Sequence, residues 1–399
     1  MHLDPQFTKN LHLQKADCLE RTRCFSEVKY DLTLNLPRGD HYSGKVIITF
    51  RVNQIPENDD VSIDFRGLNI FEFKINGETC DTIFNDHKIR LPSASLLLDQ
   101  ENTAQLYFLN MYRTDGVGLS TFTAKECGQQ YLKTRFETDF CHTIFPCFDQ
   151  PDLHAPLKLS CQTEFDWTVL TNDMEDSDAT EEDYAVARID CDEAQSIFEH
   201  IACTTPTGRR QFMFKASRAV STYSYSIIAG RFSYRERLSD GMPRLRIYAR
   251  PGFINDVNSE EIFDTYEAGL AYYKEFTGVA FPFSKYDTVF APERNYGATE
   301  SLGCVTPGSL EGLELDYVHT NSTPSMSISY NENYIFSCET ATKAKRLRFY
   351  ISILHELAHM WFGTLVSIPW WDDVGLNEAM STYIAFLAML DSPKLAQYH

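Results

Sequence analysis

Two histidines four residues apart, His355 and His359, lie in an apolar run near the C-terminal end of the chain, and Glu356 directly follows the first. If this run is a helix, both imidazoles lie on one face about one turn apart and can bind a single ion. Glu356 would then lie on a neighbouring face, where a carboxylate can reach a water molecule bound to that ion. The alternative is a core helix whose two histidines are satisfied by other hydrogen bonds.

A glutamate further along the chain favours the metal site. Two imidazoles leave a tetrahedral zinc ion without a third protein ligand. Glu378 follows His359 after eighteen intervening residues, and residues 377–390 form a second predicted helix. A helix that returns across the first would bring Glu378 to the same ion. Because a structural zinc site has all its positions filled by protein, two histidines, a glutamate and an open water position predict a catalytic zinc ion on His355, His359 and Glu378.

The composition is typical of a folded globular protein and excludes several functions. The chain has 399 residues, 43% of them apolar, which is enough for two or three domains. Its net charge of −20 argues against nucleic-acid binding, which needs clustered Lys and Arg. No apolar run is long enough for a membrane span, and the first residues lack the apolar region of a signal peptide. Eleven cysteines without a CxxC pair predict reduced thiols and a cytoplasmic location.

The distribution of strand and helix patterns predicts two domains. Residues 27–110 and 163–234 contain short alternating segments separated by turn residues, which is typical of an antiparallel β-sandwich or saddle. After about residue 230 a strand is followed by a predicted helix that begins near Ser259 and ends at Gly278. We therefore predict an α+β multidomain protein, with a strand-rich first part followed by a part that contains the helices of the metal site.

The segment HELAHMWFG, followed by LVSIPWWDDVGLNEAMSTY, resembles the zinc aminopeptidases of the aminopeptidase N family, the gluzincins. Residues 131–156, YLKTRFETDFCHTIFPCFDQPDLHAP, are similar to the family's loop against the active site, and residues 229–232 to its join between domains. The resemblance covers most of the chain. It implies an antiparallel β-domain over residues 1–230 and a thermolysin-like α+β catalytic domain, cut short, over residues 231–399. It also implies one Zn²⁺ ion and the removal of N-terminal residues from peptides.

The resemblance also implies how the substrate is held. Gly297 and Ala298 stand in the family's Gly-x-Met-Glu-Asn motif, whose backbone pairs with the substrate as an extra strand. Glu300 in the same motif and Glu137 in the loop would bind the free α-ammonium group between two carboxylates. This explains a preference for peptides with a free N-terminus. The alternative for the first motif is a plain turn around Gly297.

Several residues depart from the family pattern. Thr299 replaces Met and changes the wall of the first side-chain pocket, Ser301 replaces an amide that orients its neighbours, and Arg135 replaces Gln. Arg135 would alter the side-chain pocket or pair with a nearby acid. Residues 310–338 form a polar insertion, predicted to be a loop near the mouth of the site.

Two parts of the family pattern are not found. The family's tyrosine that hydrogen-bonds the reacting oxyanion lies well downstream of the third ligand, and neither Tyr383 nor Tyr398 matches its position. Losing one such donor typically lowers turnover by ~10²–10³. The helical C-terminal domain is also absent from the 21 residues after Glu378, so we expect either a helical C-terminal half or a complex partner. The alternative function is a catalytically impaired scaffold or complex subunit that still binds zinc.

In the expected mechanism, Glu356 is the general base. Zinc would lower the pKa of its bound water towards ~7, and Glu356 would take the proton and pass it to the leaving amine. Asp373 is a further candidate, as the group that orients a zinc-binding histidine.

Overall fold

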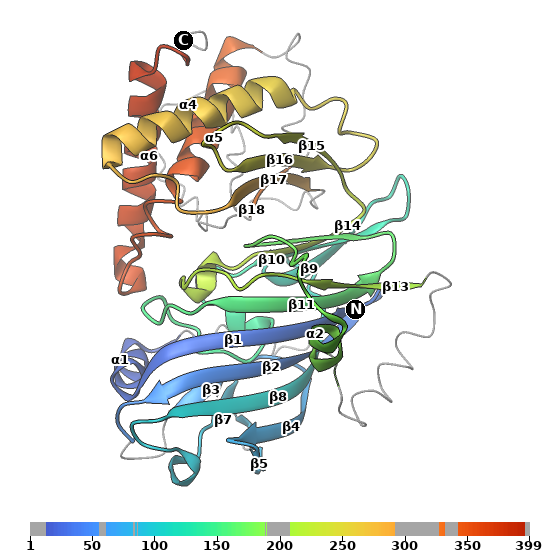
Figure 1. Ribbon diagram of the computed structural model, residues 1–399, viewed down its shortest axis with the longest axis vertical. Helices are drawn as coiled ribbons and strands as arrows, with labels where there is room; N and C mark the ends of the chain where they lie inside the picture. Colours follow the sequence, from blue (N-terminus) through green and yellow to red (C-terminus); the bar gives the residue numbers. More distant parts are fainter. Residues whose placement is uncertain are drawn as a thin grey trace.

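The computed structural model describes residues 13–55, 61–82, 84–85, 87–187, 189, 208–291, 327–331 and 342–395. A β-rich part built from the first half of the chain lies at one end of the molecule, and a part containing three long helices and a small sheet lies at the other (Figure 1). This arrangement confirms the predicted α+β fold class.

The largest sheet of the β-rich part has seven strands in the order β13-β11-β1-β2-β8-β4-β5. Apolar side chains alternate along it as predicted, for example Val46, Ile48 and Phe50, which are all fully buried. The strands are β1 (Phe25–Leu36), β2 (His41–Val52), β4 (Asn69–Ile75), β5 (Glu78–Thr79), β8 (Glu101–Met111), β11 (Leu157–Glu164) and β13 (Arg209–Met213), and helix α1 (Lys15–Cys24) precedes them.

One pairing in this sheet differs from the antiparallel layout that the sequence predicted. Strands β1 and β11 are parallel, with Tyr30 opposite Leu157, while all other neighbours in the sheet are antiparallel. A parallel pair needs a long crossover connection, and the chain between β1 and β11 supplies one. That connection includes residues 131–156, the segment predicted to contain the active-site loop.

A second, antiparallel sheet of four strands, β12-β14-β10-β9, leads into this loop. Its strands are β9 (Gly118–Thr123), β10 (Gln130–Arg135), β12 (Thr168–Thr171) and β14 (Ile227–Gly230). A small sheet of β3 (Ser62–Asp64), β7 (Lys88–Arg90) and β6 (Phe84–Asn85) and the short helix α2 (Glu181–Val186) complete the described elements of this part. Strand β10 ends two residues before Glu137, so the hydrogen bonds of this sheet fix the backbone position of Glu137.

The helical part is built on a four-stranded sheet in the order β15-β16-β17-β18. The strands are β15 (Ser233–Arg237), β16 (Arg244–Ala249), β17 (Lys285–Ala291) and β18 (Ser327–Asn331), and the helices are α4 (Ser259–Thr277), α5 (Lys343–Ala358) and α6 (Val374–Asp391). Helix α4 confirms the predicted start at Ser259, and Gly278 ends it in the left-handed conformation with φ 72°.

The two parts have separate hydrophobic cores joined by a small third cluster. One core extends from Cys24 to Ala229 in the sequence and another from Leu245 to Leu395. The joining cluster contains Leu170 and Ile228 from the β-rich part, together with Tyr248, Val289 and Ala291. This contact holds the β-rich part against the sheet of the helical part.

No helix among the described residues is long and apolar enough to cross a membrane.

Close packing of α4 on α5 generates a stability prediction. A Cβ atom on Gly269 of α4 would lie 2.7 Å from Leu354 and 2.9 Å from Leu357, both fully buried on α5. Gly269→Val should therefore destabilise the protein by about 1–3 kcal/mol through overpacking. Gly375→Val on α6, where a Cβ atom meets open space, is the matched control. Urea unfolding measures both, and equal stability of the two variants would contradict this account of the α4–α5 contact.

Candidate metal centre and substrate site

Two helices that cross each other carry the three candidate metal ligands. His355 lies in the last turn of α5, and the backbone N–H of His359 bonds to the carbonyl of His355 at 3.2 Å, so the helical course reaches the second histidine. Glu378 lies in the second turn of α6. The helices are positioned by their apolar faces: Ile353, Leu354 and Leu357 of α5 and Ile384, Ala385 and Ala388 of α6 are all fully buried. The predicted pair of helices is therefore present.

The three side chains converge on one point. The Nε2 atoms of His355 and His359 are 3.0 Å apart. One carboxylate oxygen of Glu378 lies 3.3 Å from Nε2 of His355, and the other lies 3.4 Å from Nε2 of His359. One ligand atom from each residue lies within 4.8 Å of the other two. Two imidazole nitrogens and a carboxylate are the donor set that zinc prefers in catalytic sites.

Hydrogen bonds on the far side of each ring orient the nitrogens. Nδ1 of His359 lies 3.0 Å from the backbone carbonyl of Phe362, which can only accept, so this nitrogen carries a proton. In the metal-free protein burial lowers the pKa of His359, but Glu378 outweighs burial and raises that pKa to about 9, so Nε2 also carries a proton there, which a bound cation would displace. The hydroxyl of Ser381 lies 3.1 Å from the same Nδ1 atom. Nδ1 of His355 lies 3.1 Å from the hydroxyl of Thr382. This arrangement fits a metal ion, because hydrogen bonds at Nδ1 commonly orient the ring of a histidine that binds metal through Nε2.

These partners correct one sequence-based assignment. Among the described residues the two rings are oriented by Phe362, Ser381 and Thr382, and not by Asp373. Asp373 immediately precedes α6 and is exposed, five residues and more than one helical turn before Glu378. The signal for the actual partners was present in the sequence, since residues three and four after Glu378 lie on the same helix face as Glu378.

The two imidazoles determine the charge of the Glu378 carboxyl group. Burial disfavours the ionised form of Glu378, but the neighbouring His359 and His355 outweigh it and lower the pKa of Glu378 to about 2. The carboxylate is therefore ionised at neutral pH and offers a negative charge to a bound cation.

Glu356 is buried beside these ligands, with 3% of its surface exposed. Burial raises the pKa of Glu356 to about 8, with His359 lowering it and Glu378 raising it. A carboxyl group whose pKa lies near neutrality can both accept and return a proton at physiological pH. Glu356 is thus suited to proton transfer at this cluster.

Glu137 reaches the same region from the β-rich part. It is 2% exposed, and its Oε2 atom is buried without a hydrogen-bond partner. Burial, followed by the negative charge of Glu378, raises the pKa of Glu137 to about 8, while Arg135 and His359 lower it. The Oε2 atom of Glu137 has no hydrogen-bond partner and interacts electrostatically with Glu378 and His359. A cationic group of a ligand would be stabilised at this position.

The other predicted substrate-binding residues, Gly297, Ala298 and Glu300, lie outside the described residues, as do Thr299, Ser301 and Tyr398. Of the predicted insertion over residues 310–338, only 327–331 are described. They form β18, which pairs in parallel with β17.

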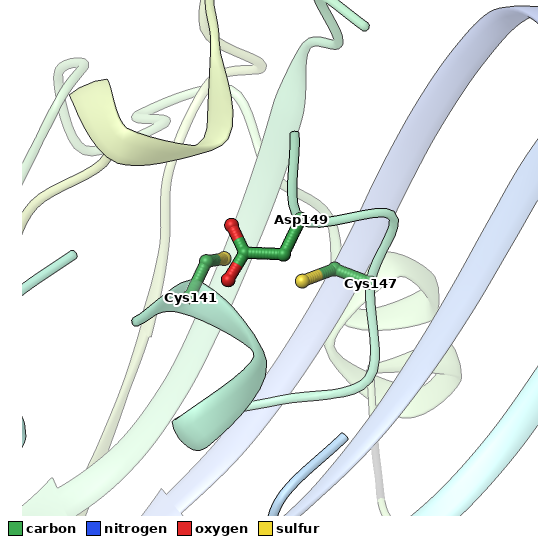
Figure 2. A group of neighbouring side chains, drawn as sticks. All are labelled: Cys141, Cys147 and Asp149. Atoms are coloured by element: carbon green, nitrogen blue, oxygen red, sulfur yellow. The ribbon is translucent and has the colours of Figure 1, made fainter. Parts of the chain in front are cut away.

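A second cluster, Cys141, Cys147 and Asp149, also has its ligand atoms within 4.8 Å of one another (Figure 2). Both oxygens of Asp149 already accept hydrogen bonds, one from Thr222 at 2.9 Å and the other from the backbone N–H of His142, also at 2.9 Å. Burial raises the pKa of Cys141 to about 12 and that of Cys147 further, so both sulfurs remain neutral thiols. Since thiolates are the metal-binding form of cysteine, this cluster is suited to packing the loop.

The raised pKa of Glu137 predicts a pH dependence of stability in the metal-free protein. Glu137 ionises near pH 4.5 in the unfolded chain and near pH 8 in the folded state, so the folded state binds more protons between these values. The free energy of unfolding should therefore fall as pH rises through this window. Urea unfolding at several pH values should show a smaller fall for Glu137→Gln, whereas Glu101→Gln, on an exposed residue, should match the wild type. An unchanged pH dependence in Glu137→Gln would contradict the burial of a protonated carboxyl group.

Comparison with known proteins agrees with the arrangement of these elements. Residues 26–188, which contain Glu137, match the Peptidase M1 N-terminal domain model. Residues 319–397, which contain His355, Glu356, His359 and Glu378, match the Peptidase family M1 domain model. Together the two models cover more than half of the chain.

Curated relatives give the same result. Aminopeptidase N of Streptomyces lividans is 28% identical over 382 residues, which cover 93% of this chain and 38% of that protein. Aminopeptidase N of Rattus norvegicus is 27% identical over 64% of this chain and 22% of its own length. Probable M1 family aminopeptidase 2 of Encephalitozoon cuniculi is 30% identical over 65% of this chain and 25% of its own length. The chain therefore spans well under half the length of these relatives, and it belongs to the M1 peptidase family, which includes aminopeptidase N.

Proposed function

We propose that this chain carries the metal centre and the amine anchor of a zinc-dependent aminopeptidase, which removes N-terminal residues from peptides. The observation that carries the proposal is the convergence of His355, His359 and Glu378, with both imidazole Nε2 atoms presented to one point. The names of the relatives, all aminopeptidases, support the reaction type.

His355, His359 and Glu378 would hold one Zn²⁺ ion. When bound, zinc lowers the pKa of coordinated water and polarises the carbonyl group of the scissile peptide bond. Phe362 and Thr382 contact the far side of the two rings, so that both Nε2 atoms face Glu378.

Glu356 would act as general base and general acid. Its raised pKa suits the removal of a proton from the attacking water and the return of that proton to the leaving amine. Burial of the carboxyl group keeps bulk water from competing for the proton.

Glu137 and Glu300 would bind the α-ammonium group of the substrate, and the backbone of Gly297 and Ala298 would align the peptide. An ammonium group beside Glu137 would favour the ionised form of that carboxyl and give its unpartnered oxygen a hydrogen-bond donor. A peptide with a blocked N-terminus offers no such charge and would leave the buried carboxylate unsatisfied. Binding of the free ammonium group therefore places the first peptide bond of the substrate at the metal centre.

We further propose a domain boundary near residue 230, which separates the β-domain, residues 1–230, from the zinc peptidase domain, residues 231–399. The change of sheet between β14 and β15 supports it. We also propose a cytoplasmic location, supported by the free thiols of the seven described cysteines with no disulfide among them.

The exposed face of α6 supports a proposal about partners. Five large apolar side chains recur on it at intervals of three or four residues and are 36–64% exposed: Leu376, Met380, Tyr383, Phe386 and Leu390. That spacing forms one stripe along the helix, of the kind that packs against a second helix. We propose that a helical polypeptide, equivalent to a part of the relatives that this chain does not match, covers the stripe.

Release of a fluorophore from aminoacyl coumarins with free amines, beside N-acetylated controls, tests the proposed reaction. Cleavage that a zinc chelator abolishes and that is confined to free amines is the expected result. A folded, zinc-loaded sample that cleaves none of them would instead favour the catalytically impaired scaffold.

Glu356→Gln should lower turnover at least about 100-fold, because it removes the general base. Its zinc content should remain one ion per chain, since the three ligands are unchanged, whereas His359→Ala should lose the ion. Metal analysis and coumarin release measure the two effects separately. Near-native turnover in Glu356→Gln would refute the assignment of the base.

Replacing Tyr383 and Phe386 together by lysine should abolish binding of the helical partner. The probe is the part of the Streptomyces lividans protein that this chain does not match, expressed separately, and the measurement is co-sedimentation. The control replaces Phe165 and Tyr234, exposed apolar residues away from α6, by lysine and should still bind. Failure of the unmodified chain to bind, or equal binding by both variants, counts against the stripe as the contact.

A further inference from the structure

Tyr223 belongs to the β-rich part but contacts the connection between the two ligand-bearing helices. We propose that Tyr223 is a positioning residue that sets α5 and α6 at the spacing the metal centre requires. This inference rests on the proposed function, and it assigns to the β-rich part a role in metal binding as well as in substrate binding.

Two contacts of Tyr223 reach opposite ends of that connection. Its phenol donates a hydrogen bond to the backbone carbonyl of Gly363 at 2.8 Å. Its ring packs against the ring of Trp371, with centroids 5.1 Å apart and planes inclined at 59°. Gly363 lies four residues after His359, and Trp371 begins the single turn, Trp371–Asp373, that leads into α6. A single side chain therefore holds both the exit from α5 and the entry to α6.

The turn at Gly363 also contains the group that orients His359. The carbonyl of Phe362, the residue before Gly363, lies 3.0 Å from Nδ1 of His359. The turn is closed by a bond from the N–H of Gly363 to the carbonyl of Val366 at 2.7 Å and by one from Thr364 to His359 at 3.2 Å. The carbonyl of Phe362 shares a rigid peptide plane with the N–H of Gly363, so a shift of Gly363 is transmitted to that carbonyl and from there to the imidazole.

The phenol remains a hydrogen-bond donor because it is buried and neutral. Tyr223 is 1% exposed, and burial raises the pKa of Tyr223, with Glu137 raising it further. A side-chain hydrogen bond with Asn377, the residue before Glu378, lowers the pKa of Tyr223. The phenol therefore lies close to Glu137, the proposed amine anchor, and to Asn377, which directly precedes Glu378 on α6.

Tyr223 is itself held firmly in the β-rich part. It lies in a single turn, Thr222–Ser224, whose first residue donates to Asp149 at 2.9 Å. The carbonyl of Ser224 accepts from the side chain of Asn172 at 2.8 Å, and the side-chain oxygen of Asn172 accepts from the N–H of Ser226 at 2.8 Å. Because the backbone around Tyr223 is held by these hydrogen bonds, its side chain can fix the position of the elements that it contacts.

The test compares Tyr223→Phe with Tyr112→Phe. Each change removes one buried hydroxyl group, but that of Tyr112 donates to the carbonyl of Pro37 at 2.9 Å, within the β-rich part. The probe is Co²⁺, titrated into the metal-free full chain against a competing chelator and followed by its visible absorption. Thermal unfolding reports the general loss of stability in both variants.

We expect Tyr223→Phe to raise the apparent dissociation constant for Co²⁺ about tenfold and to alter the absorption band, as changes around metal ligands do. Tyr112→Phe should lose similar stability and bind Co²⁺ like the wild type. Equal affinity in Tyr223→Phe and wild type, or equal weakening in both variants, would overturn the inference. If Tyr223→Phe does not fold, Trp371→Leu replaces it, with the same expected weakening, and unchanged affinity again overturns the inference.

These readouts need no substrate, so they separate two kinds of failure. A wild-type chain that binds Co²⁺ but cleaves no free-amine coumarin contradicts the proposed reaction and leaves the positioning role to be judged on affinity. A wild-type chain that binds no Co²⁺ contradicts the metal centre itself, and the positioning role with it.

Discussion

Two imidazole nitrogens 3.0 Å apart, with a carboxylate within 3.4 Å of each, form a buried group of electron-pair donors on which the site depends. Such a group repels itself in a low-dielectric interior unless a cation or a proton joins it. The protein holds the three side chains together through the apolar packing of α5 and α6 and through the hydrogen bonds on the far side of each ring. In the metal-free protein the ionised Glu378 and the protonated His359 attract each other, and a bound cation would take the place of that proton.

The same burial gives the neighbouring acids their character. Glu378 is kept ionised by the two histidines, whereas Glu356 and Glu137, which lack so close a cationic partner, have pKa values raised to about 8. Glu378 is therefore charged at neutral pH, whereas the charge of Glu356 and of Glu137 depends on the groups that bind beside them. A cationic substrate group at Glu137 and a proton at Glu356 are the natural complements of that arrangement.

The β-rich part contributes to the site through connections that end at the helices. Strand β10 delivers Glu137, and the turn Thr222–Ser224 reaches both Asp149 in the loop and Gly363 after α5. The chain between β1 and β11 includes this loop and is long enough for the crossover connection that their parallel pairing requires. The arrangement of Glu137 relative to His355, His359 and Glu378 is accordingly a property of both parts, and neither part contains it alone.

The sequence by itself determined the two helices and the three side chains that converge between them, because the relevant signals are local: histidines four apart, an apolar periodicity of 3.6, and a glutamate on the next helix. It also identified Ser259 and Gly278 as the ends of α4, since caps depend on neighbouring residues. The prediction that Asp373 orients one of the histidines was wrong, because Asp373 precedes α6, whereas Ser381 and Thr382 share the helix face of Glu378. The unpartnered oxygen of Glu137 and the contact of Tyr223 with Gly363 were decided only by the tertiary structure. Each depends on packing between segments more than a hundred residues apart, where burial and the absence of water set both the pKa and the hydrogen-bond partner.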